Sequence, residues 1–469
     1  MIALGFADVK EVSFSAAREK ICQIIKMAFG KYRFLLDSDF LAEDEKEDFR
    51  KLSADPDNGT ITLSLKMLSL FLSRYYGKKA IILLDEYDTP MQEAYVNGYR
   101  DEMTAFIRSL FNSTFKTSPY HFRGVMTGIT RISKESVFSD LNNLTVITTT
   151  SDAYGDCFGF TQQEVWNALE EYGLSAQKEL VKAWYDGFVF GRERDIYNPW
   201  SIINYLKTQR FSSYWANTSS NGLVDQLICE GSPKIKETME DLLKGRKLCT
   251  TIDEQIIFSQ LECNENAVWS LFLAGGYLKA DSYQLDEASG IEEYELTITN
   301  KEVRIMFEKM IRDWFGQSAK EYNGLIRALL QGNRKEMNAY MNRIALTTFS
   351  YFDTGNRPSG SEPERFYHGF VLGLMVELAD RYVITSNQES GFGRYDVMLK
   401  PRNKEDDAVI LEFKVFDPDD EKDLHDTVKA ALNQMESMKY KAALVAAGIS
   451  ENRIRTYGFG FKGKRVLIG

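Results

Sequence analysis

Apolar residues in the first third of the chain recur with two different spacings. Residues 12–29, 61–76 and 101–116 carry them at helical intervals. Shorter apolar runs, typical of strands, occupy residues 1–8, 80–88 and 121–129, and the last two read as buried strands. Because helices and strands alternate in this order, the pattern predicts a parallel α/β sheet.

The middle of the chain has mainly helical character. Helices are expected over residues 161–173, 175–186, 265–278 and 301–315. Residues 282–285 and 294–298 predict a hairpin with its turn at 286–290. A helix, a hairpin and a second helix in this order resemble a winged-helix arrangement.

Gly, Pro and Ser concentrate in residues 352–363, the best candidate for a linker. Beyond it we expect a helix over 364–380, two strands over 393–399 and 408–415, and a helix over 421–440. We therefore expect three domains, at residues 1–157, 158–351 and 364–469.

Composition and charge restrict the class of protein. Hydrophobic residues make up 44% and charged residues 27% of the 469, as in soluble globular proteins. The net charge of −11 argues against a generally basic surface for nucleic acid, although a local groove or bound cations can override it. Five scattered cysteines without a CxxC pair argue against a zinc site and fit a reducing cytoplasm. No apolar run of about 18 residues is present, so we expect a cytoplasmic protein without membrane contact.

Residues 81–86, IILLDE, have the form of a Walker B segment. Asp85 would emerge at the carboxyl edge of the sheet, where it could hold the magnesium of a nucleotide, while Glu86 orients the attacking water. An acidic turn after any buried strand is an equally good interpretation. Thr130 and Arg131 follow the next strand and could face the same edge, with Arg131 as a γ-phosphate sensor; a capped helix start is the alternative.

A complete phosphate-binding loop, Gly-x-x-x-x-Gly-Lys-Ser/Thr, is absent from the sequence. Residues 458–464, GFGFKGK, have the glycine spacing and the lysine, but Arg465 replaces the hydroxyl residue that would hold the metal. Too few residues follow for a helix. We interpret this stretch as a turn between two strands.

A nuclease-like set of residues lies near the end of the chain. Glu412 and Lys414 are two residues apart on one expected strand, so they project to the same face, and Asp396 on the preceding strand would lie beside them. Asp396 and Glu412 are candidate ligands for Mg²⁺ or Mn²⁺, which would polarise a phosphodiester and generate hydroxide. Lys414 would position the water or stabilise developing charge. The alternative is a surface hairpin with ordinary cross-strand charges.

Other polar residues could join this site. Glu364 and Glu377 on the preceding helix could each supply a further carboxylate, and Gln434 on the following helix could approach Glu412; for all three, a solvated helix position is the alternative. The three histidines, His121, His368 and His425, have no metal-ligand spacing and are interpreted as structural.

The sequence resembles bacterial proteins that join an AAA-ATPase-like domain to a C-terminal PD-(D/E)xK nuclease domain. Besides Asp396, Glu412 and Lys414, the matching stretches are LLDEYDTPM (83–91), GITRISKESVFSDLNNL (128–144), WYDGFVFG (184–191), YNPWSIINYL (197–206), YWANTSSN (214–221), LFLAGGYL (271–278) and FYHGFVLGLM (366–375).

The resemblance implies a P-loop NTPase-like parallel sheet, a helical lid and winged-helix-like middle, and a restriction-endonuclease-like α/β domain. It assigns Asp85 and Glu86 to the Walker B position, Arg131 to the sensor, and Asp396, Glu412 and Lys414 to the nuclease motif. Members of the family carry a phosphate-loop segment before the strand that begins this sequence. The chain therefore resembles an N-terminally shortened member.

We thus expect a divalent-metal nuclease, with Mg²⁺ or Mn²⁺, that acts on DNA or RNA. The attached ATPase-like domain is not expected to bind ATP normally, although ATP is the cofactor that the resemblance implies. The alternative is a non-catalytic sensor or scaffold that uses both folds for partner binding. A homo-oligomer is also an open alternative.

Overall fold

The computed structural model describes residues 1–54, 58–116, 118–129, 144–217, 221–253, 261, 264–287, 290–316, 319–352, 362–390, 393–403, 405–418, 420–462 and 464–469. The chain divides into two compact units. Unit 1 comprises Met1–Leu206 and Lys247–Thr299, and unit 2 comprises Lys207–Arg246 and Asn300–Gly469. None of the described helices is long and apolar enough to cross a membrane.

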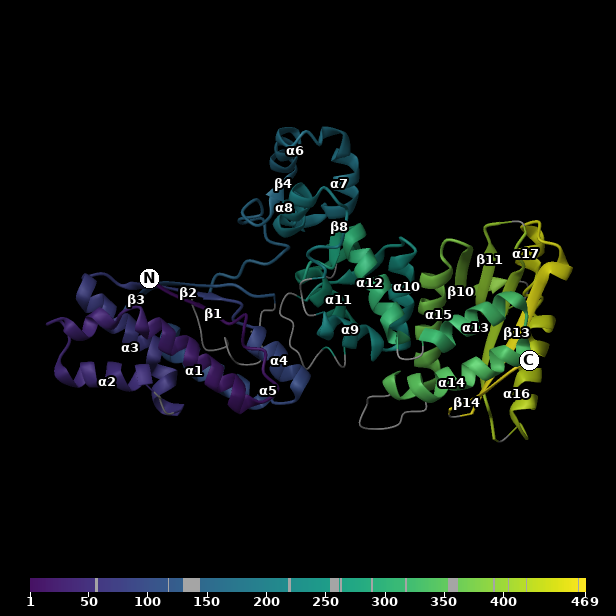
Figure 1. Cartoon of the computed structure of the whole chain (residues 1–469), viewed down its shortest axis with the longest axis horizontal. Helices are drawn as coiled ribbons and strands as arrows, with labels where there is room; N and C mark the ends of the chain where they lie inside the picture. The colour runs from purple at the N-terminus through teal and green to yellow at the C-terminus, as the bar shows by residue number, and fades with distance from the viewer. Residues whose placement is uncertain are drawn as a thin grey trace. The chain divides into compact units, whose positions relative to one another are not determined.

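Unit 1 begins with a three-stranded parallel sheet, which confirms the predicted sheet type. Its strands are β1 (Ile2–Gly5), β2 (Ala80–Asp85) and β3 (His121–Met126), in that spatial order. The associated helices are α1 (Phe14–Gly30), α2 (Glu43–Ala54), α3 (Asn58–Tyr76), α4 (Thr89–Asn97) and α5 (Arg100–Phe111). Figure 1 shows these helices gathered on one side of the strands.

The prediction that 80–88 and 121–129 form buried strands is wrong for half of β2 and most of β3. On β2, Ile82 and Leu84 are buried, whereas Ile81 is 38% exposed. On β3, Phe122 is 70% and Val125 45% exposed. The reason is positional: β3 is an edge strand, and the helices cover one face of the sheet, so apolar composition alone does not determine burial.

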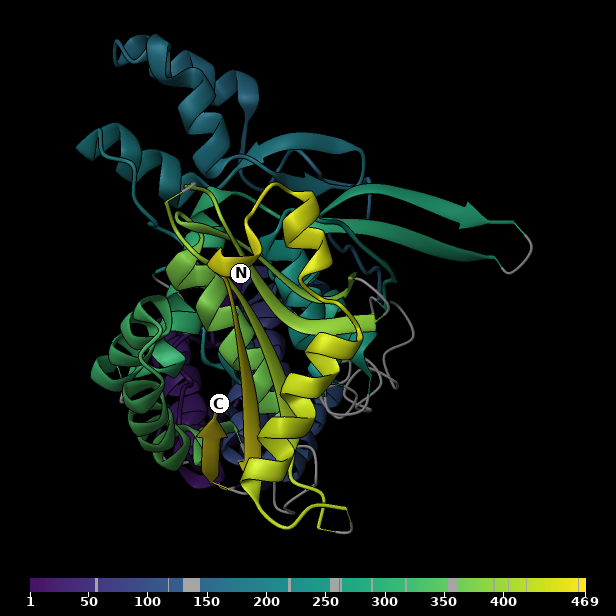
Figure 2. The same cartoon turned by 90° about the vertical axis from the view of Figure 1, so that its right-hand side faces the viewer.

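The rest of unit 1 contains two small sheets. The first has β4 (Phe160–Thr161), β5 (Phe188–Phe190) and β6 (Glu193–Tyr197), with α6 (Gln162–Glu171), α7 (Lys178–Tyr185) and α8 (Pro199–Thr208). The second has β7 (Leu248–Thr251), β8 (Leu278–Asp286) and β9 (Ile291–Ile298). Helix α11 (Glu265–Ala274) lies in the connection between β7 and β8. The predicted hairpin is present and is longer than expected, as the β8–β9 arms in Figure 2 show.

Unit 2 is built around a five-stranded mixed sheet of order β10-β11-β12-β13-β14. Its strands are β10 (Tyr382–Ser390), β11 (Gly393–Pro401), β12 (Ala408–Val415), β13 (Ile454–Lys462) and β14 (Arg465–Ile468). Only the β12–β13 pair is parallel. The helices are α9 (Gly222–Cys229), α10 (Pro233–Leu243), α12 (Lys301–Trp314), α13 (Ala319–Gln331), α14 (Arg334–Phe352), α15 (Glu362–Leu378), α16 (Leu424–Ser437) and α17 (Ala442–Ala446).

One core of unit 2 lies between the sheet and the last two helices. Met398, Ala408 and Ile410 from the sheet pack with Met435 of α16 and Leu444 of α17. Figure 2 shows α16, in yellow, lying along the strands. This core fixes α16 above one half of that face, and the other half of the face carries the polar residues described next.

Two expectations near the C-terminus change. Residues 458–464 were expected to be a turn between two strands. Two successive antiparallel strands are present, but Gly458 and Gly460 lie inside the first one, because β13 continues to Lys462 before β14 begins at Arg465. The predicted linker falls largely on residues 353–361, which lie outside the described residues, between the end of α14 and the start of α15.

Candidate active site

Asp396, Glu412 and Lys414 lie together on one face of the unit 2 sheet. β11 and β12 are antiparallel with Val397 opposite Leu411, so the next pair in the register is Asp396 and Glu412. The Asp396 side chain accepts a 2.7 Å hydrogen bond from the Phe413 backbone N–H, which ties it to β12. Lys414 follows Glu412 by two residues and therefore projects on the same side.

Glu412 is the most enclosed member of the set. The residue is 2% exposed, and its Oε1 accepts a hydrogen bond from Gln434 Nε2. Its Oε2 is buried and has no hydrogen-bond partner among the described residues. An unpaired buried carboxylate oxygen costs free energy, so this atom is a reason to expect a bound group that satisfies it.

Gln434 reaches Glu412 because α16 approaches the sheet closely. In the parallel register Gly458 lies beside Glu412 and Gly460 beside Lys414. A Cβ at Gly458 would lie 3.0 Å from the Val428 carbonyl oxygen, and one at Gly460 would lie 3.2 Å from Thr427 Cβ. The two glycines therefore leave room for α16, and the Gln434 amide also donates to the Tyr440 hydroxyl at 3.1 Å.

The environment disfavours the charged form of both carboxyl groups. Burial raises the pKa of Asp396, and the Phe413 N–H and the Lys414 ammonium oppose that rise. Burial raises the pKa of Glu412 further, and the neighbouring Asp396 charge adds to it, against the Asp396 backbone amide and Lys414. Lys414 forms no ion pair with a described carboxylate, so its charge acts on both groups from a distance.

This donor set fits a hard divalent cation. Two facing carboxylates provide oxygen ligands, and the unpartnered Glu412 Oε2 is a lone acceptor in need of a positive charge. No group of three or more His, Cys, Asp or Glu side chains with metal-binding geometry occurs in the described part of the chain. Two carboxylates suit Mg²⁺ or Mn²⁺, since Mg²⁺ commonly keeps several waters and is completed by substrate phosphate oxygens.

Of the other predicted carboxylates, Glu377 does not join the set. Glu377 forms a 3.1 Å ion pair with Arg312 of α12. The Glu364 side chain lies outside the described residues. His368 is buried with Nε2 3.7 Å from Glu237 Oε1, and burial lowers its pKa to about 4.

In unit 1, Asp85 lies at the carboxyl end of β2, as predicted, and Glu86 follows it with a left-handed φ of 51°. Both residues are exposed. The Thr127 hydroxyl donates to Asp85 Oδ1, and the Thr89 hydroxyl donates to Glu86 Oε2 at 3.2 Å. Thr130 and Arg131 lie outside the described residues, so the expected sensor position has no structural description.

A third carboxylate at this edge, Asp88, was missed by sequence reasoning. It is 1% exposed and accepts hydrogen bonds from the Ile129 N–H at 3.0 Å and from Gln92 Nε2 at 2.9 Å. A Cβ at Gly128 would lie 2.4 Å from Asp88 Oδ1, so any larger residue there would displace the Asp88 carboxylate. Asp88 thus fastens the segment after β3 to the segment after β2. The sequence signal that could have indicated this contact is an aspartate shortly after β2, Asp88, together with a glycine shortly after β3, Gly128.

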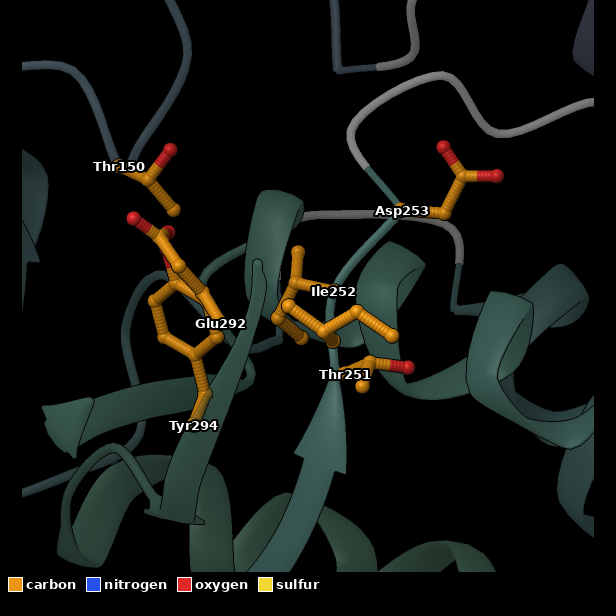
Figure 3. A pocket seen from close by; sticks show the side chains of 7 residues that line it. Thr150, Thr251, Ile252, Asp253, Glu292 and Tyr294 are labelled. Carbon is orange, nitrogen blue, oxygen red and sulfur yellow. The ribbon is translucent and has the colours of Figure 1, made fainter. Parts of the chain in front are cut away.

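Unit 1 also has a hollow of about 470 Å³ beside β7 and β9 (Figure 3). Its carboxylates, Asp253 and Glu292, come from opposite sides of the opening in Figure 3. Glu292 accepts a 2.6 Å hydrogen bond from the Tyr294 hydroxyl. Among the described residues that line the hollow, no arrangement comparable to the three residues of unit 2 occurs.

Comparison with known proteins gives matches to both ends of the chain. Residues 1–138 match a family described as predicted AAA-ATPase, and residues 362–469 match the PD-(D/E)XK nuclease superfamily. A protein of Azotobacter chroococcum mcd 1, described as an uncharacterized protein in the vnfD 5' region, is 29% identical over 237 residues. That alignment covers 49% of this chain and 42% of the relative, so the chain spans less than half of the relative's length. No solved structure matches.

Proposed function

We propose that this chain, which joins an AAA-ATPase-like domain to a C-terminal PD-(D/E)XK nuclease superfamily domain, is a divalent-metal-dependent nuclease that cleaves DNA or RNA. The observation that carries the proposal is the buried Glu412, whose Oε2 lacks a partner among the described residues, opposite Asp396 and two residues before Lys414. Superfamily membership supports phosphodiester chemistry, and the placement of these three side chains supports the assignment of that chemistry to them.

Each residue has a distinct role in the proposed reaction. Asp396 and Glu412 would hold a Mg²⁺ or Mn²⁺ ion, which when bound polarises the phosphate and lowers the pKa of water. Lys414 would donate to the attacking water or to a phosphoryl oxygen, where negative charge accumulates. Gln434, held near Tyr440, would keep the Glu412 carboxylate oriented, as residues behind metal ligands generally do.

We further propose that the N-terminal part is a P-loop NTPase-like sheet whose Asp85, Glu86 and Arg131 correspond to Walker B and sensor positions. Together with a helical lid and winged-helix-like middle, it would regulate the nuclease domain. The match of residues 1–138 to the predicted AAA-ATPase family supports this.

The test is cleavage of labelled DNA and RNA, single- and double-stranded, with Mg²⁺, Mn²⁺ or EDTA. Wild type, Asp396→Ala and Glu412→Gln are compared with Glu436→Gln, which changes an exposed glutamate on α16 and serves as the matched control. The proposal predicts metal-dependent cleavage by wild type and Glu436→Gln and none by the two site variants. Folding of each variant is checked by its thermal melting temperature.

Two results would reject the proposal. Cleavage that persists in both site variants would place the chemistry elsewhere or in a contaminant. A folded wild-type protein that cleaves none of the substrates with either metal would favour the scaffold interpretation, in which both folds serve only to bind partners.

A further inference from the structure

Two buried polar atoms of unit 1 lack hydrogen-bond partners and lie close to each other. Asp186, which directly follows α7, is 8% exposed, and its Oδ1 has no partner among the described residues. Tyr197, the last residue of β6, is fully buried, and its hydroxyl has no partner among them either. Burial and then the charge of Asp186 raise the pKa of the Tyr197 hydroxyl, so the two groups are neighbours. Unpaired buried polar atoms cost free energy, and this pair therefore indicates a bound group that contacts both.

A bulge in the β5–β6 hairpin brings a second carboxylate to the same place. Between the paired positions, β6 has two residues, Arg194 and Asp195, where β5 has only Val189. Asp195 has a left-handed φ of 56°, a conformation that few residues other than glycine, asparagine and aspartate adopt. Bulges redirect side chains and are frequent beside functional sites. Here burial raises the pKa of Asp186 to about 6 and the Asp195 charge adds to the rise, so the two carboxyl groups are close.

One ammonium group contacts both carboxylates. Lys182 Nζ lies 3.2 Å from Asp195 Oδ1 and 3.9 Å from Asp186 Oδ2. It also donates to Gln162 Oε1 at 2.7 Å. These contacts involve one oxygen of each carboxylate, and the Asp186 oxygen that Lys182 contacts is not the unpartnered Oδ1. The lysine therefore leaves the position beside Asp186 Oδ1 and the Tyr197 hydroxyl unfilled.

The charge around the Tyr197 hydroxyl is negative. Besides Asp186 and Asp195, the exposed Glu179 of α7 also raises its pKa. Lys182 is the cation that the described ion pairs place on these carboxylates, so the negative charges exceed the positive one by two. A buried water would satisfy Asp186 Oδ1 and the hydroxyl without reducing this charge, whereas a hydrated divalent cation does both. The donors here are oxygens, which Ca²⁺ and Mg²⁺ prefer.

We propose that Asp186 and Asp195 bind a divalent cation of the oxygen-preferring class, Ca²⁺ or Mg²⁺, and that the Tyr197 hydroxyl donates to a water on the ion. The ion would join the end of α7 to the β5–β6 hairpin. This site is separate from the proposed nuclease site and does not depend on it. Asp186 lies in WYDGFVFG (184–191) and Tyr197 begins YNPWSIINYL (197–206), two stretches for which the proposed function gives no role.

The experiment uses the full chain with the unit 2 carboxylates removed, D396A/E412Q, so that metal binding there does not contribute. Tb³⁺ serves as the probe, because tyrosine and tryptophan side chains close to a bound ion sensitise its luminescence. Asp186→Asn, Asp195→Asn and Glu171→Gln are each added to this background. Glu171 is an exposed glutamate of α6 and provides the matched control.

The background protein is expected to show saturable Tb³⁺ luminescence that Ca²⁺ or Mg²⁺ reverses at roughly 10⁻⁴–10⁻³ M. Asp186→Asn and Asp195→Asn should each weaken Tb³⁺ binding at least about tenfold, because ligand charge sets the affinity of such sites. Glu171→Gln should bind as the background does.

The melting temperature with and without Ca²⁺ provides a second measurement. Ca²⁺ should raise it in the background and in Glu171→Gln but not in Asp195→Asn, because a ligand stabilises only the folded state that binds it. Asp195→Asn is the variant to rely on if Asp186→Asn does not fold. Its side chain is half-exposed, and asparagine tolerates the left-handed backbone of this position.

Three results would overturn the inference. They are equal Tb³⁺ affinity in the background, Asp186→Asn and Asp195→Asn; luminescence that neither Ca²⁺ nor Mg²⁺ reverses; and a folded background protein that binds no Tb³⁺. In the last case a buried water or a proton shared by the two carboxyl groups would occupy the place. Because the unit 2 carboxylates are absent from every protein in this test, none of these outcomes bears on the proposed nuclease.

Discussion

The two ends of the chain each place carboxylates at a sheet, but in opposite environments. In unit 1, Asp85 and Glu86 are exposed and each accepts a hydrogen bond from a neighbouring threonine. In unit 2, Asp396 and Glu412 face each other, burial raises the pKa of both, and one Glu412 oxygen lacks a partner among the described residues. Buried carboxyl groups with perturbed pKa values are the arrangement expected where chemistry occurs, and of these two pairs only the unit 2 pair is buried in this way.

The largest expected effect is on cleavage. Asp396→Ala should lower the rate at least about a thousandfold, because loss of a metal ligand removes several kcal/mol of transition-state stabilisation. Asp85→Ala, in unit 1, should leave the rate of the isolated protein within about twofold of wild type. Single-turnover cleavage assays measure both. A similar loss of cleavage rate in Asp85→Ala would show that cleavage depends on both regions, and would contradict the contrast between the exposed carboxylate pair in unit 1 and the reactive pair in unit 2.

Gln434→Ala should have an intermediate effect. Its side chain holds Glu412 without touching the expected substrate position, and residues of this kind typically contribute 10–100-fold to activity or metal affinity, so we expect a loss of roughly that size. The measurement is the rate as a function of Mn²⁺ concentration. A positioning role predicts that saturating metal restores part of the rate; an equal loss at every metal concentration argues against it.

Glycines of the two sheets differ in how closely other elements pack against them, and glycine-to-alanine substitutions test this difference. Gly458→Ala and Gly460→Ala should each destabilise the protein by about 1–2 kcal/mol, because their new Cβ atoms would meet α16. Gly5→Ala, on β1 of unit 1, has no neighbour within 4 Å of the added atom and should cost less than about 0.5 kcal/mol. Chemical denaturation gives the three values. Equal costs at Gly5 and Gly460 would contradict the close approach of α16.

The smallest effect is a gain in stability without metal. At pH 7, Glu412→Gln should stabilise the protein by about 1 kcal/mol, because it removes a carboxyl whose charged form is disfavoured, whereas Asp85→Asn should change stability by less than about 0.5 kcal/mol.

The sign of the pH dependence follows from the raised pKa of Glu412. The folded state binds more protons than the unfolded state, so this contribution lowers stability as pH rises above the ordinary carboxyl value of about 4 and vanishes below it. Urea denaturation at pH 3.5 and pH 7 checks this. A Glu412→Gln variant less stable than wild type at pH 7 would show that the carboxylate is well accommodated.

The strands that carry the carboxylates of both units were predicted from the sequence, because their positions depend on local periodicity. The IILLD run predicted β2 with Asp85 at its end, and the two-residue spacing of Glu412 and Lys414 predicted a shared face. The antiparallel pairing of β11 with β12 then followed from two strands with a polar turn between them.

The remainder depends on tertiary neighbours that periodicity does not encode. The exposure of Phe122 follows from the edge position of β3, and the approach of Gln434 to Glu412 depends on two glycines in a third strand. Asp88 acquires its role only when the segments after β2 and β3 meet. Each of these features joins residues more than 20 positions apart, where sequence spacing gives no distance.

The most direct test of the central claim is calorimetric titration of Mn²⁺ into wild type, Asp396→Ala and Asp85→Ala at two pH values. Wild type and Asp85→Ala should bind Mn²⁺ in unit 2, with proton release and with affinity that increases with pH, because Asp396 and Glu412 must lose protons to bind metal. Asp396→Ala should lose this binding. Binding that is unchanged in Asp396→Ala, or lost in Asp85→Ala, would contradict the assignment of the metal site to unit 2.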